Sequence, residues 1–220
     1  MDVLAAEQTR TNKQWFQGTA DAVRQSMQHL VNHVCEHVLI LSGDQLYQMD
    51  YQKLLADHIA KGAEISIATT PVTAADATGF GIMKVNEIGI IDKFIEKPAT
   101  ELLPNWTSPV EQKHQQAGKH FLASMGIYLF NKEVLLKLFA DYPTANDFGK
   151  EIIPSAIYSD YKVSAYAFGG YWTDIGTIAS FMEANLALTD VIPNFNLFSN
   201  TKKVYTHSRI LPLPNCAKQL

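Results

Sequence analysis

The sequence predicts an α/β fold with a mostly parallel sheet and a β-hairpin insertion. His37–Ser42 is an almost unbroken apolar run, which is typical of buried central strands that helices cover on both faces. A helical pattern and a second strand, Glu64–Thr70, follow closely enough to form a βαβ unit with parallel strands. Asn86-Glu87-Ile88-Gly89 separates two further strand patterns and is a hairpin signal.

The first part of the chain predicts a strand and two helices around the βαβ unit. Val3–Ala6 is a short apolar run that predicts a strand, and a helix is expected to begin near Gly18, with Thr19 as its N-cap. Apolar residues recur in that helix at helical spacing: Val23, Met27, Leu30, Val31 and Val34. The helix of the βαβ unit has Asp50 as N-cap candidate and Gly62 just past its end, and its apolar face comprises Tyr51, Leu54, Leu55 and Ile59.

The second part of the chain begins with the hairpin strands Phe80–Val85 and Ile90–Glu96. Pro98–Lys119 is polar and contains prolines, so it predicts a long loop, and such loops are often functional. The remaining predicted elements are a strand at Phe121–Phe130, a helix at Lys132–Ala140, a helix at Phe148–Tyr158 with a bend at Pro154, a strand at Lys162–Phe168, and a helix at Thr177–Leu188 whose apolar face is Ile178, Phe181, Met182 and Leu186. Residues 191–220 lose the pattern and are predicted to be a linker.

Composition excludes several classes of protein. Hydrophobic residues make up 47% of the 220 and charged residues 18%, which excludes wholesale disorder. The net charge of -4 argues against a dedicated binder of nucleic acid or anionic membranes, and no apolar run approaches the roughly 20 residues of a membrane span. Cys35 and Cys216 lie far apart and form no disulfide framework, so a reducing, cytoplasmic compartment is expected.

Three charged residues near the ends of predicted elements are candidates for chemistry. Asp44 follows a strand and Gly43, where its carboxylate could hold Mg²⁺ at the sheet edge or only cap a turn. Asp174 precedes a helix among glycines and aromatic residues, where it could belong to a site or act as a helix cap. Lys97 ends a hairpin strand after Glu96 and could hold a phosphate or be an ordinary charged strand end.

Other patterns predict no site. His29, His33 and His37 recur at four-residue spacing, but the third is expected to begin a strand, so zinc is disfavoured. Ser124 lacks the G-x-S-x-G elbow of a nucleophile, and no Walker A motif or glycine-rich phosphate loop occurs.

Seven segments in order resemble the ADP-glucose pyrophosphorylases (glucose-1-phosphate adenylyltransferases) of bacteria and plants. They are Trp15-Phe16-Gln17-Gly18-Thr19-Ala20-Asp21-Ala22-Val23-Arg24, Leu41-Ser42-Gly43-Asp44-Gln45-Leu46-Tyr47, Gly79-Phe80-Gly81-Ile82-Met83, Phe94-Ile95-Glu96-Lys97-Pro98, Ala123-Ser124-Met125-Gly126-Ile127-Tyr128, Asp147-Phe148-Gly149-Lys150-Glu151-Ile152-Ile153-Pro154 and Tyr171-Trp172-Thr173-Asp174-Ile175-Gly176-Thr177. No single segment is decisive, but seven in family order, spread over most of the chain, are specific.

The resemblance implies a Rossmann-like, GT-A-like nucleotidyltransferase fold and a reaction of ATP with glucose 1-phosphate that yields ADP-glucose and pyrophosphate for glycogen or starch synthesis. It implies Mg²⁺ on Asp44 and Asp174, and glucose 1-phosphate on Lys97 with Glu96. Gly81 and Ser124 would line the sugar pocket. Phe16, Gln17, Gly18 and Asp21 would lie near the nucleotide or sugar. A homo- or hetero-tetramer is expected for the full-length family member.

The sequence also departs from the family. Gln45 stands where the motif often carries His, and Phe16 where many bacterial members carry Tyr. The family's N-terminal glycine-rich loop and C-terminal β-helix domain have no counterpart here, so residues 1–190 are interpreted as a catalytic domain that is incomplete at its N-terminus. The isolated chain is therefore expected to be inactive and to fold poorly. A non-catalytic sugar-phosphate-binding or regulatory subunit remains the alternative, and a pyrophosphorylase for another nucleotide or sugar is less favoured.

Overall fold

The computed structural model describes Leu4, residues 15–197 and Val204. The chain divides into two compact units, one formed by Met1–Asp44 with Met49–Gly170 and the other by Gln45–Gln48 with Tyr171–Leu220. Apart from Leu4, the strand predicted at Val3–Ala6 lies outside the described residues, as do Cys216 and most of the predicted linker at 191–220. None of the helices in the described part is long and apolar enough to cross a membrane.

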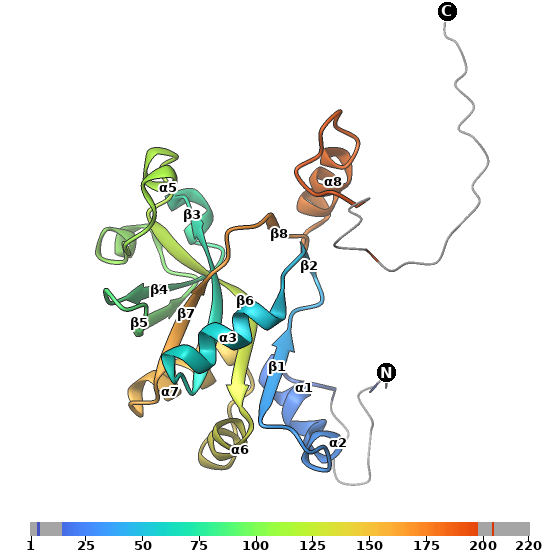
Figure 1. Cartoon of the computed structure of the whole chain (residues 1–220), viewed down its shortest axis with the longest axis vertical. Helices are drawn as coiled ribbons and strands as arrows, with labels where there is room; N and C mark the ends of the chain where they lie inside the picture. Colours follow the sequence, from blue (N-terminus) through green and yellow to red (C-terminus); the bar gives the residue numbers. More distant parts are fainter. Residues whose placement is uncertain (1–3, 5–14, 198–203, 205–220) are drawn as a thin grey trace, which may run out of the picture. The chain divides into compact units, whose positions relative to one another are not determined.

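The larger unit is built on a six-stranded sheet (Figure 1). Its strands are β1 (His37–Leu41), β3 (Ile65–Val72), β4 (Gly81–Val85), β5 (Ile91–Glu96), β6 (Phe121–Asn131) and β7 (Val163–Ala167). The order is β5-β4-β6-β3-β7, and β1 also pairs with β6. Since β1, β3 and β4 run antiparallel to β6 and β7 runs parallel to β3, four of the six strands point the same way. The predicted α/β fold with its β4–β5 hairpin is confirmed. Among the ladders of the described sheet only β3–β7 is parallel, because β6 runs opposite to the three strands that pair with it.

Strand β1 differs from the buried central strand that its apolar run predicts. It points the same way as β3, as a βαβ unit requires, but β6 lies between the two. Within the described residues β1 pairs with β6 alone, so only Val38 of this strand is buried and Leu41 is 43% exposed. The apolar run identified the strand but not its position in the sheet, because strand order depends on contacts distant in sequence.

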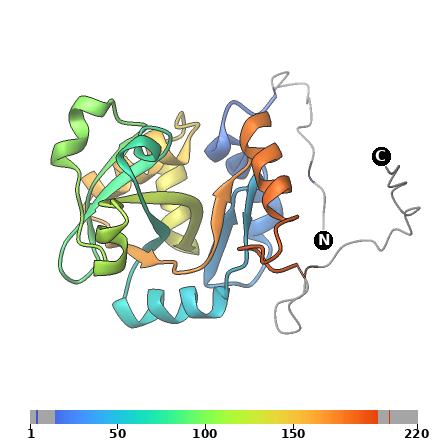
Figure 2. The same ribbon diagram turned by 90° about the horizontal axis from the view of Figure 1, so that it is seen from above.

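Helices cover both faces of this sheet. The helical segments are α1 (Thr19–Gln25), α2 (Met27–Val31), α3 (Tyr51–Lys61), α4 (Ala74–Ala77), a 3₁₀ helix (η1, Thr100–Asn105), α5 (Gln112–Gln116), α6 (Lys132–Asp141), a π-helical turn (η2, Phe148–Ile152) and α7 (Ile153–Tyr158). Helix α3 lies on one face, and α6 and α7 lie on the other (Figure 2). The long loop predicted at Pro98–Lys119 in fact contains η1 and α5, because the buried side chain of Leu103 anchors the segment to a small apolar cluster.

Helix termini show which local signals were reliable. The Asp50 side chain accepts a hydrogen bond from the Gln52 N–H at 3.1 Å, and Gly62 ends α3 with φ of 56°, both as predicted. Thr19 is not the N-cap of α1, because Gly18 occupies that position and Thr19 Oγ1 instead accepts from the Phe148 N–H at 3.2 Å.

Helix α3 turns a histidine toward the sheet where an isoleucine was expected. Leu54 and His58 are its buried residues, whereas Ile59 is 60% exposed. The His58 ring is accommodated because Nδ1 lies 2.8 Å from Ser66 Oγ and Nε2 lies 2.9 Å from Asn131 Oδ1. Hydrogen-bond partners on β3 and β6 thus allow the His58 ring to be buried, although the sequence of α3 alone predicts that this histidine is exposed to solvent.

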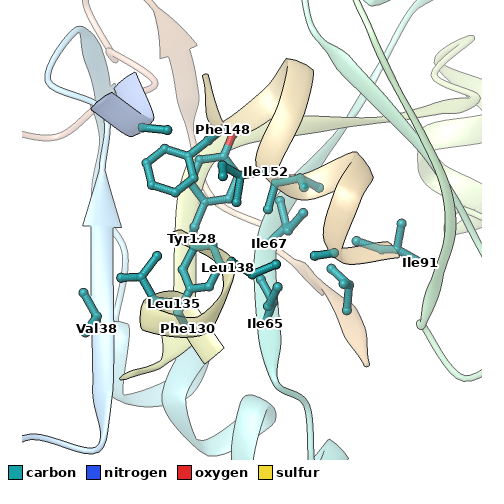
Figure 3. Packing of buried hydrophobic residues seen from close by; sticks show 14 of the residues in the cluster. Val38, Ile65, Ile67, Ile91, Tyr128, Phe130, Leu135, Leu138, Phe148 and Ile152 are labelled. Atoms are coloured by element: carbon teal, nitrogen blue, oxygen red, sulfur yellow. The ribbon is translucent and has the colours of Figure 1, made fainter. Parts of the chain in front are cut away.

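The main core fills the space between the sheet and α6, η2 and α7. Aromatic rings form its centre, with Phe148 packed 5.5 Å from Tyr128 and 5.8 Å from Phe130 between centroids (Figure 3). The labelled aliphatic residues around them come from the strands and from the covering helices: Val38, Ile65, Ile67, Ile91, Leu135, Leu138 and Ile152. Phe148 joins this core to the turn that follows Asp147, and that turn forms one wall of the site described below.

The smaller unit contains an antiparallel pair, β2 (Gln45–Tyr47) and β8 (Trp172–Asp174), followed by α8 (Ile178–Ala187). A capping box begins α8, since Thr177 and Ser180 exchange side-chain to backbone hydrogen bonds. The apolar face predicted for this helix is exposed, and its buried residue is Ala184.

Candidate functional site

Two strands share one edge of β6, and the candidate site lies where they part. β1 pairs with the second half of β6, ending with Leu41 opposite Ile127, whereas β4 pairs with the first half, beginning with Ile82 opposite Ala123. Ser124 and Met125 are thereby left without a ladder partner on that edge, whereas the Gly126 carbonyl accepts from the Ser42 N–H at 3.2 Å. Gly126 adopts a φ of 65°, which favours glycine. Such a change of partner along a sheet edge is where α/β folds place ligands.

Ser124 is fixed in orientation at this opening. Its hydroxyl accepts a hydrogen bond from the Gly126 N–H at 3.2 Å and is also bonded to the Tyr128 side chain. Burial raises the pKa of Tyr128 to about 12, with smaller contributions from the charges of Glu96 and Asp147. Tyr128 is therefore a neutral hydroxyl at physiological pH, and it holds Ser124 as a polar group at the edge of the opening.

The Glu96 carboxylate occupies a space that two glycines leave. Gly81 is its partner across the β4–β5 ladder, and a Cβ there would lie 2.7 Å from Glu96 Oε2. A Cβ at Gly149 would lie 2.8 Å from the same oxygen. Any larger residue at either position would push Glu96 away, so the two glycines permit its half-buried placement.

Charged residues from two segments act on Glu96. Burial is the main cause that raises the pKa of this carboxyl group, and the negative charge of Asp147 raises it further. The positive charges of Lys97 and Lys150 act in the opposite direction. Two acidic and two basic residues thus lie in one part of the larger unit, a combination that suits a ligand with both hydroxyl and anionic groups.

Lys97 has an unusual backbone conformation directly after β5. Its φ of 47° lies in the left-handed region, which non-glycine residues rarely adopt. The Lys97 N–H donates to the Phe80 carbonyl at 3.0 Å, and Pro98, the next residue, is buried. These contacts fix the exposed Lys97 beside Glu96, so the predicted Glu96–Lys97 pair is brought together with Gly81 and Ser124.

The segment 146–151 closes the site from the α7 side. Asp147 caps the π-helical turn by accepting from the Lys150 N–H at 2.9 Å. Glu151 in turn accepts from the Asn146 and Asp147 N–H groups at 2.7 Å and 3.0 Å. The resemblance includes this segment but implies no role for Asp147 or Lys150; the sequence signal for them is Gly149, a glycine among charged residues.

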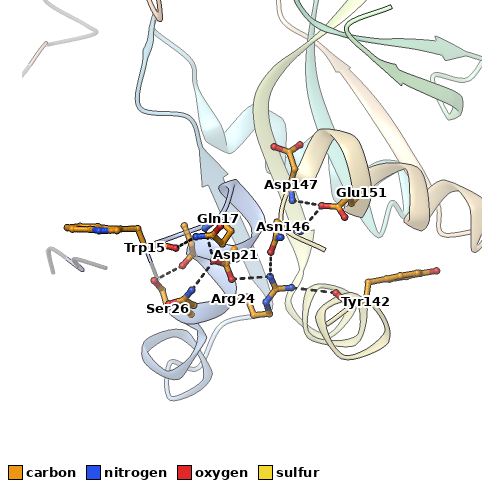
Figure 4. A network of polar contacts seen from close by, with 11 residues as sticks. Trp15, Gln17, Asp21, Arg24, Ser26, Tyr142, Asn146, Asp147 and Glu151 are labelled. Carbon is orange, nitrogen blue, oxygen red and sulfur yellow. Dashed lines mark hydrogen bonds and ion pairs between the residues drawn. The ribbon is translucent and has the colours of Figure 1, made fainter. Parts of the chain in front are cut away.

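The predicted residues near the N-terminus form a network of their own (Figure 4). Asp21 is buried and accepts hydrogen bonds from the Gln17 N–H at 2.9 Å, the Gln25 amide at 2.8 Å and the Arg24 guanidinium at 3.1 Å. Arg24 also donates to the Asn146 side chain, which ties α1 to the segment that carries Asp147. Asp21 thus positions α1 through three hydrogen bonds, and its place near the nucleotide or sugar stays a prediction.

The other members of the N-terminal motif are more open or serve close packing. A Cβ at Gly18 would lie 2.3 Å from the Asn146 carbonyl oxygen, so this glycine permits α1 to begin directly against that loop. The Ala20 N–H then donates to the same oxygen at 2.8 Å. Gln17 is exposed and Phe16 is half-buried, and both remain predicted rather than tested ligand contacts.

The two predicted metal-binding acids belong to different units. Asp44 is exposed at the end of the larger unit's first segment and has no hydrogen-bond partner among the described residues. Asp174 ends β8 in the smaller unit, where it is paired in register with Gln45, the residue after Asp44. Its Oδ1 accepts from the Gly176 N–H at 2.9 Å, so the local role of Asp174 is a turn, and Thr177 rather than Asp174 caps α8.

The donor set suits magnesium better than a transition metal. Both side chains offer carboxylate oxygens, which hard cations prefer, and Mg²⁺ is commonly held by one or two carboxylates together with substrate phosphates. No group of three or more His, Cys, Asp or Glu side chains within the described part could hold a metal by itself. His37 begins β1 whereas His29 lies in α2, so these histidines do not share one helix face.

Comparison with known families identifies the family of this chain. The family model described as nucleotidyl transferase matches residues 1–191, which is most of the chain. That span includes the glycine-flanked Glu96, Lys97, Ser124 and both acids described above. The α/β sheet with its opening at β6 and the matched span agree, and the chain is a member of the nucleotidyl transferase family.

Proposed function

We propose that this nucleotidyltransferase is a glucose-1-phosphate adenylyltransferase, which joins ATP and α-D-glucose 1-phosphate to give ADP-glucose and pyrophosphate. The observation that carries the proposal is the Glu96–Lys97 pair held at the opening of β6. A carboxylate confined between two glycines accepts hydrogen bonds from sugar hydroxyls, and the adjacent ammonium group pairs with a phosphate. The choice of adenine and glucose rests on the seven motifs, which resemble the ADP-glucose branch.

The reaction needs positioning and charge neutralisation rather than a base. An oxygen of the sugar phosphate, already ionised at neutral pH, forms a bond to the α-phosphorus of ATP. The bond from that phosphorus to the oxygen bridging the β-phosphorus breaks, and pyrophosphate leaves with the electron pair. Lys97 would hold the attacking phosphate while Glu96 and Ser124 orient the sugar, so that a reaction of two anions becomes an oriented one.

Asp44 and Asp174 would hold the catalytic Mg²⁺. Magnesium bound there would supply positive charge to the nucleotide phosphates, which lowers their repulsion of the incoming sugar phosphate. The exposed, unpartnered Asp44 carboxylate and the second oxygen of Asp174 are available for this role. Asp44→Asn and Asp174→Asn should each weaken magnesium-dependent ATP binding and leave glucose 1-phosphate binding within about twofold.

Calorimetric titration with glucose 1-phosphate tests the proposal directly. We expect the wild-type chain to bind the ligand and Lys97→Ala to bind it about ten- to a hundredfold more weakly, since a charge-assisted hydrogen bond contributes about 1.5–3 kcal/mol. Lys93→Ala is the matched control on the same hairpin, and its affinity should not change. Binding that Lys97→Ala leaves intact, or a preference for another sugar phosphate, would contradict the assignment.

Turnover is a separate measurement, with ATP, glucose 1-phosphate and Mg²⁺ and detection of ADP-glucose. Binding of glucose 1-phosphate without turnover would agree with the expected inactivity of this chain as well as with the non-catalytic, sugar-phosphate-binding alternative, so turnover is the outcome that excludes that alternative. Turnover with another nucleoside triphosphate in place of ATP would refute the adenine assignment while preserving the family chemistry.

A further inference from the structure

The charge of a second lysine, Lys150, acts on the same carboxylate as that of Lys97. Lys150 lies in the π-helical turn that follows Asp147, far from Lys97 in sequence. Its positive charge acts on Glu96, as does that of Lys97. Neither ammonium group has an ion-pair or hydrogen-bond partner within the described part of the chain. Two unpaired cations therefore border one half-buried acid.

The backbone of Lys150 is held firmly although its side chain is exposed. The Lys150 N–H donates to Asp147 Oδ1 at 2.9 Å, and the preceding residue, Gly149, packs directly against the Glu96 carboxylate. The Thr19 hydroxyl lies 3.5 Å from Asp147 Oδ2, so α1 also supports the turn. The Lys150 side chain thus begins from a fixed point beside the sugar-phosphate pocket.

A second lysine would help to neutralise the charge of a bound phosphate. A phosphate monoester carries close to two negative charges at neutral pH, and Lys97 alone would neutralise only one. Glu96 and Asp147 add further negative charge to the same wall, which would repel the phosphate. A second ammonium group removes that imbalance without altering the hydroxyl-binding role of the acids.

We propose that Lys150 is a second phosphate-binding residue, whose ammonium group contacts the phosphate of the sugar phosphate together with Lys97. This inference rests on the proposed function, since it assigns a further residue to the same sugar-phosphate site. It also sets a specificity, because a site with two cations favours a dianionic monoester over a neutral sugar or a singly charged ligand.

Calorimetric titrations of wild type, Lys150→Ala and Lys150→Arg with glucose 1-phosphate, ATP, inorganic phosphate and glucose test the inference. We expect Lys150→Ala to weaken glucose 1-phosphate binding at least about tenfold, Lys150→Arg to restore most of it, and affinity for ATP to stay within about twofold. The salt dependence of glucose 1-phosphate binding should also become shallower in Lys150→Ala. Inorganic phosphate should lose affinity in the same variant, whereas any response to glucose should not change.

The remaining outcomes separate this inference from the proposed function. If Lys97→Ala abolishes binding while Lys150→Ala matches wild type, the Lys150 assignment is wrong and the proposed function stands. If wild type binds neither glucose 1-phosphate nor phosphate, both fail together. A loss of ATP affinity in Lys150→Ala with intact sugar-phosphate binding would also overturn the assignment, since it would place the lysine at the nucleotide. A pKa of Glu96 that rises in Lys150→Ala, followed by NMR titration of the carboxyl carbon, would support the contact without any ligand.

Discussion

Gly149→Ala is the sharpest perturbation of the site that the structure offers. The added Cβ would lie 2.8 Å from Glu96 Oε2 and 3.2 Å from Glu96 Cδ, with Asp147 Oδ1 at 3.5 Å. An ordinary contact needs about 3.4 Å or more, so the carboxylate must move by roughly half an ångström. The φ angle of Gly149 is not in the left-handed region, so alanine introduces no backbone strain.

Stability and binding should respond differently to this substitution. The clash involves mainly the end of a flexible side chain, so its cost should lie at the lower end of about 1–3 kcal/mol for overpacking. Alanine offsets part of that cost because it favours a helical turn over glycine by about 1 kcal/mol. The net change in unfolding free energy should be about 1 kcal/mol or less, which corresponds to about 2–4 °C in melting temperature.

Binding of glucose 1-phosphate should fall much further. If Glu96 leaves its position, the ligand loses a charge-assisted hydrogen bond of about 1.5–3 kcal/mol, or roughly ten- to a hundredfold in affinity. Thermal unfolding and calorimetry on the same samples give both values, and Gly169→Ala is the control because nothing lies within 4 Å of a Cβ there. The reasoning fails if Gly149→Ala binds like wild type while Glu96→Gln does not, because the glycine would then not position the carboxylate.

Three further predictions concern buried polar groups. Burial lowers the pKa of His58 below its usual 6.5, so the unfolded chain binds a proton at this residue more readily than the folded chain. The free energy of unfolding should therefore be constant above about pH 6.5 and fall below it by up to about 1.4 kcal/mol per pH unit. In urea unfolding at pH 7.5 and 5.5, His58→Gln should remove this slope, whereas the control His29→Gln should not. Asp21→Ala leaves the Arg24 guanidinium without its carboxylate partner and should lower stability by about 1–3 kcal/mol in the same assay, and an unchanged urea midpoint would contradict its positioning role. Tyr128→Phe should cost about 0.5–1.5 kcal/mol of stability and weaken glucose 1-phosphate binding less than tenfold, because Ser124 keeps its bond from the Gly126 N–H; a loss as large as that of Lys97→Ala would show that the hydroxyl contacts the ligand.

Local signals in the sequence predicted the elements well. The apolar runs identified β1, β3 and β6, and Asp50 and Gly62 marked both ends of α3, because strands and helix caps depend mainly on neighbouring residues. The hairpin was equally accessible, since Asn86 Oδ1 accepts from the Ile88 and Ile90 N–H groups within the turn itself. These features need no information about distant parts of the chain.

The failures at Thr19 and His58 involve partners that are distant in sequence. Threonine often caps helices, but the Thr19 hydroxyl accepts a hydrogen bond from the Phe148 N–H instead of from its own helix. His58 is polar, yet it is buried because its two ring nitrogens form hydrogen bonds with the side chains of Ser66 and Asn131. A pattern along one element cannot report such bonds, since it contains no record of which other element will lie opposite.

The candidate site illustrates both sides of that limit. Glu96, Lys97, Gly81 and Ser124 were identified through motifs, but the reason they meet is the shared edge of β6, which no motif contains. The β1 and β4 ladders leave Ser124 and Met125 between them, and the glycines at 81 and 149 leave space for the Glu96 carboxylate. The site therefore depends on Gly81 and Gly149, which have no side chain, as much as on the charged residues. That dependence explains why a substitution that adds a single methyl group should impair ligand binding more than it impairs folding.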